Sequence, residues 1–366
     1  MLTTFTAPAF AGTWYIEDGD ITISAGESGN NVTQNENTTK NDTDTIITNR
    51  EEGASSHTVT IDAKDKDDKV EVTLKDANID TSKQSKAAVS VTGSGDTTIE
   101  LDGDNELQGG DRHAGLEHNQ TVDSEGNVTS GKLTIQDDND NAGSLTATGG
   151  YFGAGIGGGS AKAGQVTITG GTITAISGDG AGIGGGQGNM GSNAGNADIE
   201  ISGGTIEATG GYTSAGIGGG YYGDATIKIT GDAVIKNATG GTFGAGIGGG
   251  GGGNGDVTIS GNAKIENAQG GYAGSGIGGG YGASGTVTIK DDSTVTATGG
   301  EAGAGIGGGV GGLADVTIEG NATVNAIGGV GSAGIGGGYD AENDEDDGNG
   351  NQISIKSNES GAPTVN

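Results

Sequence analysis

The chain has 366 residues, of which 84 are glycine and 2 are proline, and apolar side chains make up only 30% of it. So little apolar material excludes a large globular core, and a formal net charge of −32 makes nucleic acid and anionic membranes unfavourable partners. The chain has no cysteine and no run of about 18 apolar residues, which excludes disulfide bonds and membrane insertion through an apolar helix.

Residues 1–56 are predicted to be an N-terminal cap and irregular loop region. The opening segment MLTTFTAPAFAG has two interpretations: small residues at Ala9 and Ala11 are typical of the end of a secretory signal, and a packed cap is the alternative. The polar run from Glu27 to Lys40 is interpreted as a loop. A solenoid must cover its terminal coil, and the apolar residues available for this are Trp14, Tyr15, Ile16, Ile21 and Ile23.

From His57 onward, apolar residues alternate with polar ones, which is the period of a strand with one buried face. The segment GAGIGGG, first seen at residues 153–159, then recurs with small changes about every 30 residues. Each repeat also holds an alternating pair such as Val166 and Ile168, followed after a turn by an apolar residue such as Ile173. A fixed period of this length indicates a solenoid, whose repeats bury their apolar faces only against their neighbours. The central isoleucines of the seven copies are Ile156, Ile183, Ile217, Ile247, Ile277, Ile306 and Ile335.

Three short strands in each repeat predict one coil of a right-handed parallel β-helix, an all-β fold. Residues 57–366 are assigned to this β-helix, with regular AGIGGG coils at 132–340 and a C-terminal coil at 350–366. Less regular copies of the glycine segment begin at Ala87 and Ala114, which gives ten or eleven coils in all. With ~4.8 Å between stacked strands, the rod would be roughly 50 Å long.

The glycine segment and the tyrosines beside it predict a ligand-binding face. Because Ile156 points inward, Gly155 and Gly157 are expected to point outward and to leave a floor of bare backbone in every coil. Seven of the eight tyrosines lie just before or just after a glycine segment, so stacking would align them in two rows along this floor. A flat floor with aromatic margins suits an extended polysaccharide, whose rings pack on aromatic side chains. The candidate binding residues are Gly155, Gly157, Tyr151, Tyr212, Tyr221, Tyr222, Phe243, Tyr272, Tyr281 and Tyr339.

A resemblance supports the same interpretation. The segments VEVTLKDANI, KAAVSVTG, TTIELDGDNELQGG and GKLTIQDDNDNAGSLTATGG, followed by GAGIGGG, resemble the β-helical carbohydrate-binding domains of clostridial-type bacterial surface proteins. The resemblance covers about residues 57–356 and implies a polysaccharide-lyase-like superhelix that is extracellular or on the cell surface. It also implies non-catalytic binding of cellulose or acidic plant polysaccharides, with bound calcium. The very regular AGIGGG coils depart from the pattern of that family.

Acidic loops offer the oxygen ligands that calcium prefers. The candidate metal ligands are Asp137, Asp138, Asp140, Asp340, Asp344 and Asp346. The alternative interpretation is that these loops only keep the rod soluble, because none of them matches an EF-hand loop.

Few residues in this sequence could act as catalytic groups. Arg112, His113 and His118 form the one cluster with potential for acid–base chemistry, and an insertion loop is the alternative interpretation. Glu200 and Glu207 do not form the recurring carboxylate pair that a glycosidase needs. We therefore expect a binding module rather than an enzyme, with polysaccharide lyase as the remaining enzyme class. The other alternative is a structural or adhesin module that self-associates or packs against neighbouring domains.

Overall fold

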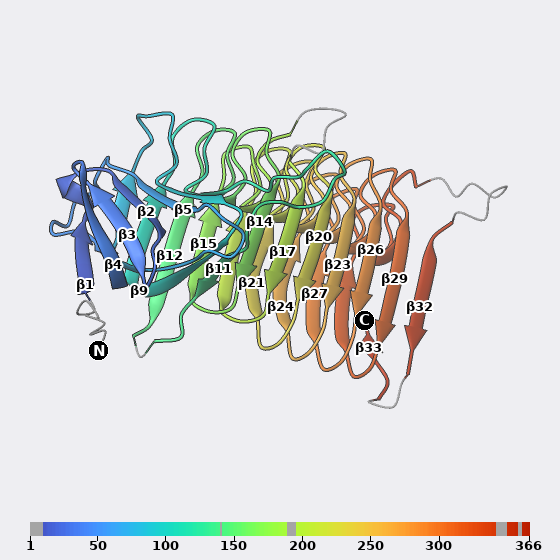
Figure 1. Ribbon diagram of the computed structural model, residues 1–366. Coiled ribbons are helices and arrows are strands. Elements are labelled where there is room, and N and C mark those ends of the chain that lie inside the picture. Colours follow the sequence, from blue (N-terminus) through green and yellow to red (C-terminus); the bar gives the residue numbers. More distant parts are fainter. Residues whose placement is uncertain (1–9, 140, 189–194, 342–349, 358–360) are drawn as a thin grey trace.

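The computed structural model describes residues 10–139, 141–188, 195–341, 350–357 and 361–366. The chain winds into a parallel β-solenoid, and its strands stack in three columns along the axis (Figure 1). The glycine column alone holds eleven strands, so the all-β solenoid of ten or eleven coils is confirmed. No helix in the described part of the chain is both long and apolar enough to cross a membrane.

The first column contains the strands with alternating valine and isoleucine residues. Both members of each pair face the interior; Val257 and Ile259, for example, are fully buried. Its strands are β1 (Phe10–Tyr15), β4 (Asn37–Thr48), β6 (Lys69–Lys75), β9 (Asp96–Gln108), β11 (Leu133–Gln136), β14 (Gly164–Ile168), β17 (Ala197–Ile201), β20 (Ala225–Ile229), β23 (Gly255–Ile259), β26 (Gly285–Ile289), β29 (Ala314–Glu319) and β32 (Gln352–Lys356).

The second column follows after a turn, and β9 is long enough to contribute to both columns. Equivalent residues stack directly: the Asn267 side chain donates a hydrogen bond to the Asn237 side chain at 2.7 Å, which makes a short asparagine ladder. The other strands of this column are β7 (Asn78–Asp80), β12 (Gly143–Thr148), β15 (Thr172–Ile176), β18 (Thr205–Thr209), β21 (Val234–Thr239), β24 (Lys264–Gln269), β27 (Thr294–Thr298), β30 (Thr323–Ile327) and β33 (Thr364–Val365).

The glycine column closes each coil. Its isoleucines stack in one internal row, in which Ile156 lies opposite Ile183 and Ile183 opposite Ile217. Leu116 and Val89 continue the same row toward the N-terminus, which confirms the two irregular early copies. The strands of this column are β2 (Ile21–Ala25), β5 (Val59–Ala63), β8 (Val89–Gly93), β10 (Leu116–His118), β13 (Ile156–Gly157), β16 (Ile183–Gly184), β19 (Ile217–Gly218), β22 (Ile247–Gly248), β25 (Ile277–Gly278), β28 (Ile306–Gly307) and β31 (Ile335–Gly336).

The N-terminal end of the solenoid is covered by a β-hairpin. Strand β3 (Asn30–Gln34) pairs antiparallel with β2 and with β4, and a short 3₁₀ helix, η1 (Ile16–Asp18), precedes β2. Ile16, Ile21 and Ile23 are buried in this cap, as predicted. The interpretation of residues 27–40 as a loop is wrong, because β3 and the start of β4 occupy most of that range. The parallel pairings β1–β4 and β2–β5 also place the start of the solenoid before residue 57.

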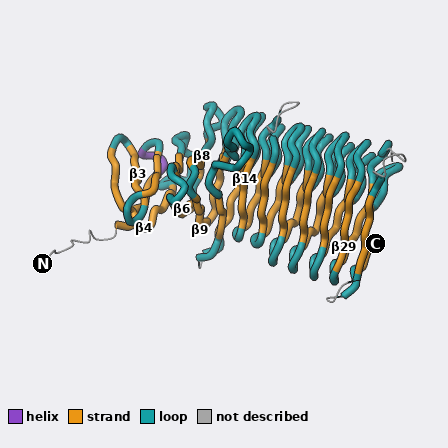
Figure 2. Tube along the Cα trace, turned by 45° about the vertical axis from the view of Figure 1, so that its right-hand side comes forward, coloured by secondary structure: helices purple, strands orange, loops and turns teal. Residues whose placement is uncertain are grey.

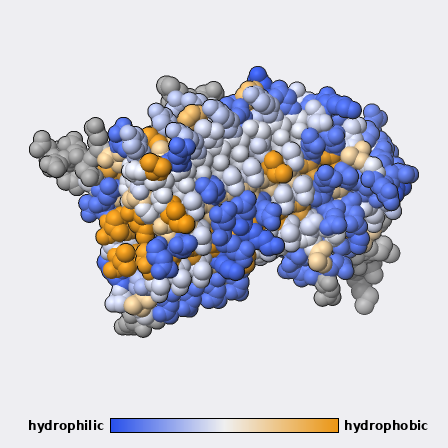
Figure 3. Space-filling view, turned by 180° about the vertical axis from the view of Figure 1, so that it is seen from behind, coloured by the Kyte–Doolittle hydropathy of each residue, from blue (hydrophilic) through white to orange (hydrophobic). Residues whose placement is uncertain are grey.

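The C-terminal end is more open. Ile353 and Ile355 of β32 are 41% and 50% exposed, whereas Val316 and Ile318, on which they stack, are fully buried. Figure 3 shows hydrophobic surface at this end of the molecule. The last described coil therefore leaves apolar side chains uncovered that every inner coil buries.

The close stacking of the glycine column makes a first prediction about stability. Gly248 has a φ of +140°, and an added Cβ would collide with the carbonyl oxygen of Gly278 in the next coil. We expect Gly248→Ala to lower the free energy of unfolding by about 3 kcal/mol or more, because backbone strain and a steric clash add. Urea denaturation followed by circular dichroism measures this change.

Gly282→Ala is the matched control. Gly282 also has a positive φ, +72°, but nothing lies within 4 Å of its added Cβ. We expect this variant to lose only about 1–2 kcal/mol, the cost of the left-handed conformation. Equal losses in the two variants would show that close stacking is not what requires glycine at position 248.

Candidate functional site

Within the described residues, two turns flank each regular glycine strand except β16. In the coil of Ile247 these are a leading turn at 242–244 and a trailing turn at 251–252. Trailing turns hydrogen-bond to the leading turn of the coil before them: the Gly251 N–H donates to the Thr213 carbonyl at 2.7 Å, and the Tyr281 N–H to the Phe243 carbonyl at 2.8 Å. The turns therefore join in a continuous row along one side of the solenoid, which Figure 2 shows as the loops along its upper edge.

The glycine strands are buried, and the predicted bare floor is wrong. Both Gly155 and Gly157 are buried. An added Cβ at Gly155 would lie 2.7 Å from the carbonyl oxygen of Gly182, and Gly157 has a φ of +127°. The atoms nearest to these two glycines are backbone atoms of the next coil, such as the Gly184 carbonyl oxygen, and of the second column, such as the Ala147 carbonyl oxygen. The glycines permit close stacking and positive φ, and they do not offer a surface to a ligand.

The tyrosines, in contrast, lie on the surface of the turns. Tyr151, Tyr212, Tyr272, Tyr281 and Tyr339 are each 50–61% exposed. The two expected rows meet instead of bordering a floor, because the Phe243 ring lies 5.4 Å from the Tyr212 ring and 5.5 Å from the Tyr281 ring. We call this line of side chains the aromatic ridge; its members are Tyr151, Phe152, Tyr212, Tyr221, Tyr222, Phe243, Tyr272, Tyr281 and Tyr339.

The exposed tyrosines recur in every second coil. Tyr151, Tyr212 and Tyr272 each lie five residues before a central isoleucine, and the coils between them carry Gly178 and Thr242 at that position. In the trailing turns, Tyr221, Tyr281 and Tyr339 follow the same alternation. Since stacked strands are ~4.8 Å apart, equivalent tyrosines are spaced by ~9.6 Å along the ridge.

A hollow of about 400 Å³ lies in the middle of the ridge. Its walls are Tyr221, Tyr222, Phe243 and Tyr281, and its floor includes glycines of the trailing turns. The Tyr221 hydroxyl donates to the Tyr222 hydroxyl at 3.1 Å, and this hydrogen bond raises the pKa of Tyr221. The hollow thus combines ring faces with a pair of linked hydroxyl groups.

A second hollow, of about 490 Å³, lies at the N-terminal end of the ridge. Arg112 and His113 line it, as does Phe152 of the ridge. His113 Nδ1 lies 2.8 Å from Glu117 Oε2, and this hydrogen bond raises the pKa of His113. The sequence did not single out Glu117, although it occupies the place of Gly157 in the register and could have been found as a break in the glycine column.

His118 does not belong to this hollow. Its ring is buried, with Nδ1 3.2 Å from the Val91 carbonyl and Nε2 2.9 Å from the Gly131 carbonyl. Burial lowers the pKa of His118. The structure therefore separates the predicted cluster into Arg112 and His113 at the surface and a structural histidine inside.

Of the two glutamates tested as a glycosidase pair, Glu200 serves as a charge partner and Glu207 does not. Glu200 lies 3.3 Å from Lys132 and 3.4 Å from Lys228, and the hydrogen bond from Lys132 lowers the pKa of Glu200. Glu207 stacks against Asn237 in the second column, with no carboxylate opposite it in that pairing.

The predicted calcium ligands are only partly within the described residues. The Asp137 carboxylate accepts a hydrogen bond from the Gly143 N–H at 3.1 Å, and Asp138 donates its N–H to Glu100 at 3.0 Å. Asp340 has a φ of +59° in a turn. Within the described ranges, no three acidic or histidine side chains converge on one point. Asp140, Asp344 and Asp346 lie outside these ranges, so calcium binding stays a prediction.

Comparison with protein families bears on the architecture. Six segments match the model of the beta helix repeat, at residues 141–160, 166–187, 199–221, 257–281, 287–310 and 316–339. The chain is a β-solenoid, and the part between residues 141 and 339 contains six beta helix repeats. Searches of the curated proteins and of the solved structures found no match to this solenoid. The matched segments begin in the second or first column and end in the trailing turns, so they include most of the aromatic ridge.

The His113–Glu117 pair makes a prediction about titration. We expect Glu117→Gln to lower the pKa of His113, because the charged hydrogen-bond partner that favours the imidazolium is lost. Titration of the imidazole signals by NMR measures this, with His57 as the internal reference. Since folding raises this pKa, the pair stabilises the fold at acidic pH, and the contribution is lost as pH rises through the folded-state pKa. An unchanged pKa in the variant would contradict the assignment.

Proposed function

We propose that the solenoid is a non-catalytic binding module for an extended polysaccharide, which lies along the aromatic ridge. We place its action outside the cell or on the cell surface, where such polymers occur. The observation that carries the proposal is the single file of half-exposed tyrosine rings on the row of turns. Rings that are exposed without a protein partner on one face are available to the C–H faces of sugar rings.

The spacing of the ridge supports a linear polymer. One coil advances by ~4.8 Å, which is close to the length of one extended sugar unit. Equivalent tyrosines recur every second coil, so a straight chain would meet an equivalent ring every two units. A small globular ligand would use one such position, whereas a polymer can use all of them and gain from multivalency.

The residue types of the ridge support binding over hydrolysis. The ridge consists of tyrosine and phenylalanine side chains on glycine-rich turns, which supply packing area and hydroxyl groups. Glycoside hydrolysis usually depends on a pair of carboxylates at a fixed separation. The resemblance to carbohydrate-binding domains of clostridial-type surface proteins favours the same conclusion.

Substitutions on the ridge test the proposal. We expect Tyr281→Ala to weaken binding to the preferred polysaccharide about tenfold, because a central aromatic contact is lost. Affinity electrophoresis against a panel of neutral and acidic polysaccharides, with calcium present, measures the retardation of wild type and variant.

Two controls sharpen this test. Tyr281→Phe retains the ring and should keep most of the affinity, whereas Thr288→Ala, in the first column, should change nothing. Absence of retardation for the wild type in every gel would contradict polysaccharide binding. If the wild type instead forms a dimer in light scattering, and Tyr281→Ala abolishes it, the ridge is a self-association surface of a structural module.

A further inference from the structure

The hollow beside Glu117 lies where the glycine column is interrupted. From Gly157 to Gly336, every regular coil has a positive-φ glycine after its central isoleucine. In the coil before these, Glu117 pairs with Gly157 and Ser90, so a carboxylate stands in the glycine position. The row of turns changes shape at this coil, and the second hollow opens above it.

Glu117 is held firmly in this hollow. Its side chain is only 9% exposed, and its carboxylate accepts hydrogen bonds from the Ala114 N–H at 3.1 Å and from the Asn119 amide at 2.9 Å. The Asn119 side chain in turn accepts from the Gly159 N–H at 2.9 Å. Because the carboxylate is anchored by several donors, it fixes the His113 ring through Nδ1. The other ring nitrogen, Nε2, has no hydrogen-bond partner among the described residues.

Three cationic groups surround the free side of this hollow. Besides His113, its walls carry Arg112 and Lys162. The Lys162 ammonium has no ion-pair partner within the described ranges, and the Arg112 guanidinium lies 5.9 Å from the centre of the Phe152 ring. The whole chain has only 16 basic residues against 48 acidic ones. Three basic side chains around one hollow therefore contrast with the acidic composition of the rest of the chain.

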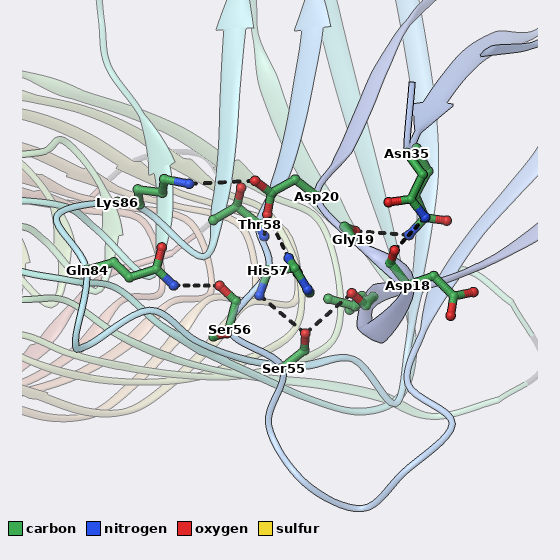
Figure 4. Close-up of polar contacts among 12 residues, drawn as sticks. Asp18, Gly19, Asp20, Asn35, Ser55, Ser56, His57, Thr58, Gln84 and Lys86 are labelled. Carbon is green, nitrogen blue, oxygen red and sulfur yellow. Dashed lines mark hydrogen bonds and ion pairs between the residues drawn. The ribbon is translucent and has the colours of Figure 1, made fainter. Parts of the chain in front are cut away.

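Neighbouring charges do not cancel this cluster. Asp111 is exposed and lies 3.8 Å from Arg112, which makes it a weak partner in water. His113 and Glu117 also line an adjoining hollow toward the N-terminus, which contains Asp20 and Lys86. Figure 4 shows that Asp20 is engaged there by His57 and Thr58 and faces Lys86, 3.6 Å away. Of the charged residues that line this hollow, Arg112, Lys162 and protonated His113 outnumber Glu117. Asp111 and Asp179, which contact Arg112 and Gln187, are not part of its lining.

We propose that this hollow is a binding site for an oxyanion, a carboxylate or a sulfate ester carried by a ring-shaped ligand. Arg112 supplies planar paired donors, Lys162 a point charge, and His113 an N–H from Nε2. Phe152 supplies an apolar wall against which the ring of the ligand packs. The site needs no calcium, and it goes beyond the proposed function because Phe152 is the one residue of the aromatic ridge that it uses.

Binding at this site depends on pH. His113 donates from both ring nitrogens only when it is protonated, and Glu117 favours that form. An oxyanion therefore binds more tightly below the pKa of His113 than above it. Glu117 acts as a positioning residue, because it orients His113 and does not face the ligand with a free donor.

Small probes test the site without any polysaccharide. We expect glucuronate and inorganic sulfate, added in the presence of a calcium chelator, to shift the NMR signals of the His113 imidazole at about pH 5.5. Glucose should not shift them. If both anions bind with similar affinity, the site recognises oxyanions in general. If glucuronate binds at least tenfold more tightly than sulfate, the natural group is a carboxylate on a sugar ring. The reverse order favours a sulfate ester.

Variants separate this site from general electrostatics. Arg112→Gln and Lys162→Gln should each weaken anion binding roughly tenfold, as expected for the loss of a charge-assisted hydrogen bond. Lys228→Gln removes the same charge from the first column and should leave the affinity unchanged. Tyr281→Ala should also leave it unchanged, although it weakens polysaccharide binding. Three results would overturn the proposal. In the first, Lys228→Gln weakens anion binding as much as Arg112→Gln does. In the second, the anions bind as strongly at about pH 8.5 as at about pH 5.5, and in the third they do not shift the His113 signals.

Discussion

The solenoid depends on the distance between consecutive coils. Parallel strands in register bring the backbone of one coil against that of the next at ~4.8 Å. At the positive-φ glycines of the regular coils this leaves no space for a side chain, because the carbonyl oxygen of Gly278 occupies the place of a Cβ on Gly248. The same register that forces glycine inside also aligns the turns outside. The order of the aromatic ridge therefore follows from the packing of the backbone beneath it.

The two surface features of the molecule reflect this constraint in opposite ways. Where the glycine column is regular, the turns are nearly identical, and Tyr212, Phe243 and Tyr281 come within contact of one another across coils. Where Glu117 replaces glycine, the repeat is broken and a charged hollow replaces the aromatic surface. Regular stacking thus produces a long, uniform surface, and its interruption produces a local and chemically distinct one.

The sequence correctly predicted the features of the fold that depend on the periodicity of the side chains. Alternating pairs such as Val166 and Ile168, and the row of isoleucines from Ile156 onward, specify which residues face inward and how the coils align. The role of the glycines was predicted incorrectly, because the turns are closed by backbone hydrogen bonds such as that from Gly251 to Thr213, which leave no trace in side-chain pattern. The hairpin at residues 30–48 was missed for a related reason: its strands are polar and its burial alternates only weakly. Glu117 was overlooked because only the register of the coils shows that it stands opposite Gly157, although its partners His113 and Asn119 lie within four residues of it in the chain.

The alternation of tyrosines has a consequence for how such a protein can change in length. Because each repeat of a solenoid contacts only its neighbours, whole coils can be added or removed without disturbing the packing of distant coils. Here a single duplicated coil would place two tyrosine-bearing coils, or two coils without tyrosine, side by side. Duplication of a two-coil unit of about sixty residues would instead preserve the alternation of coils with and without tyrosine. If the spacing of the rings is under selection, longer and shorter forms of this solenoid should differ by even numbers of coils.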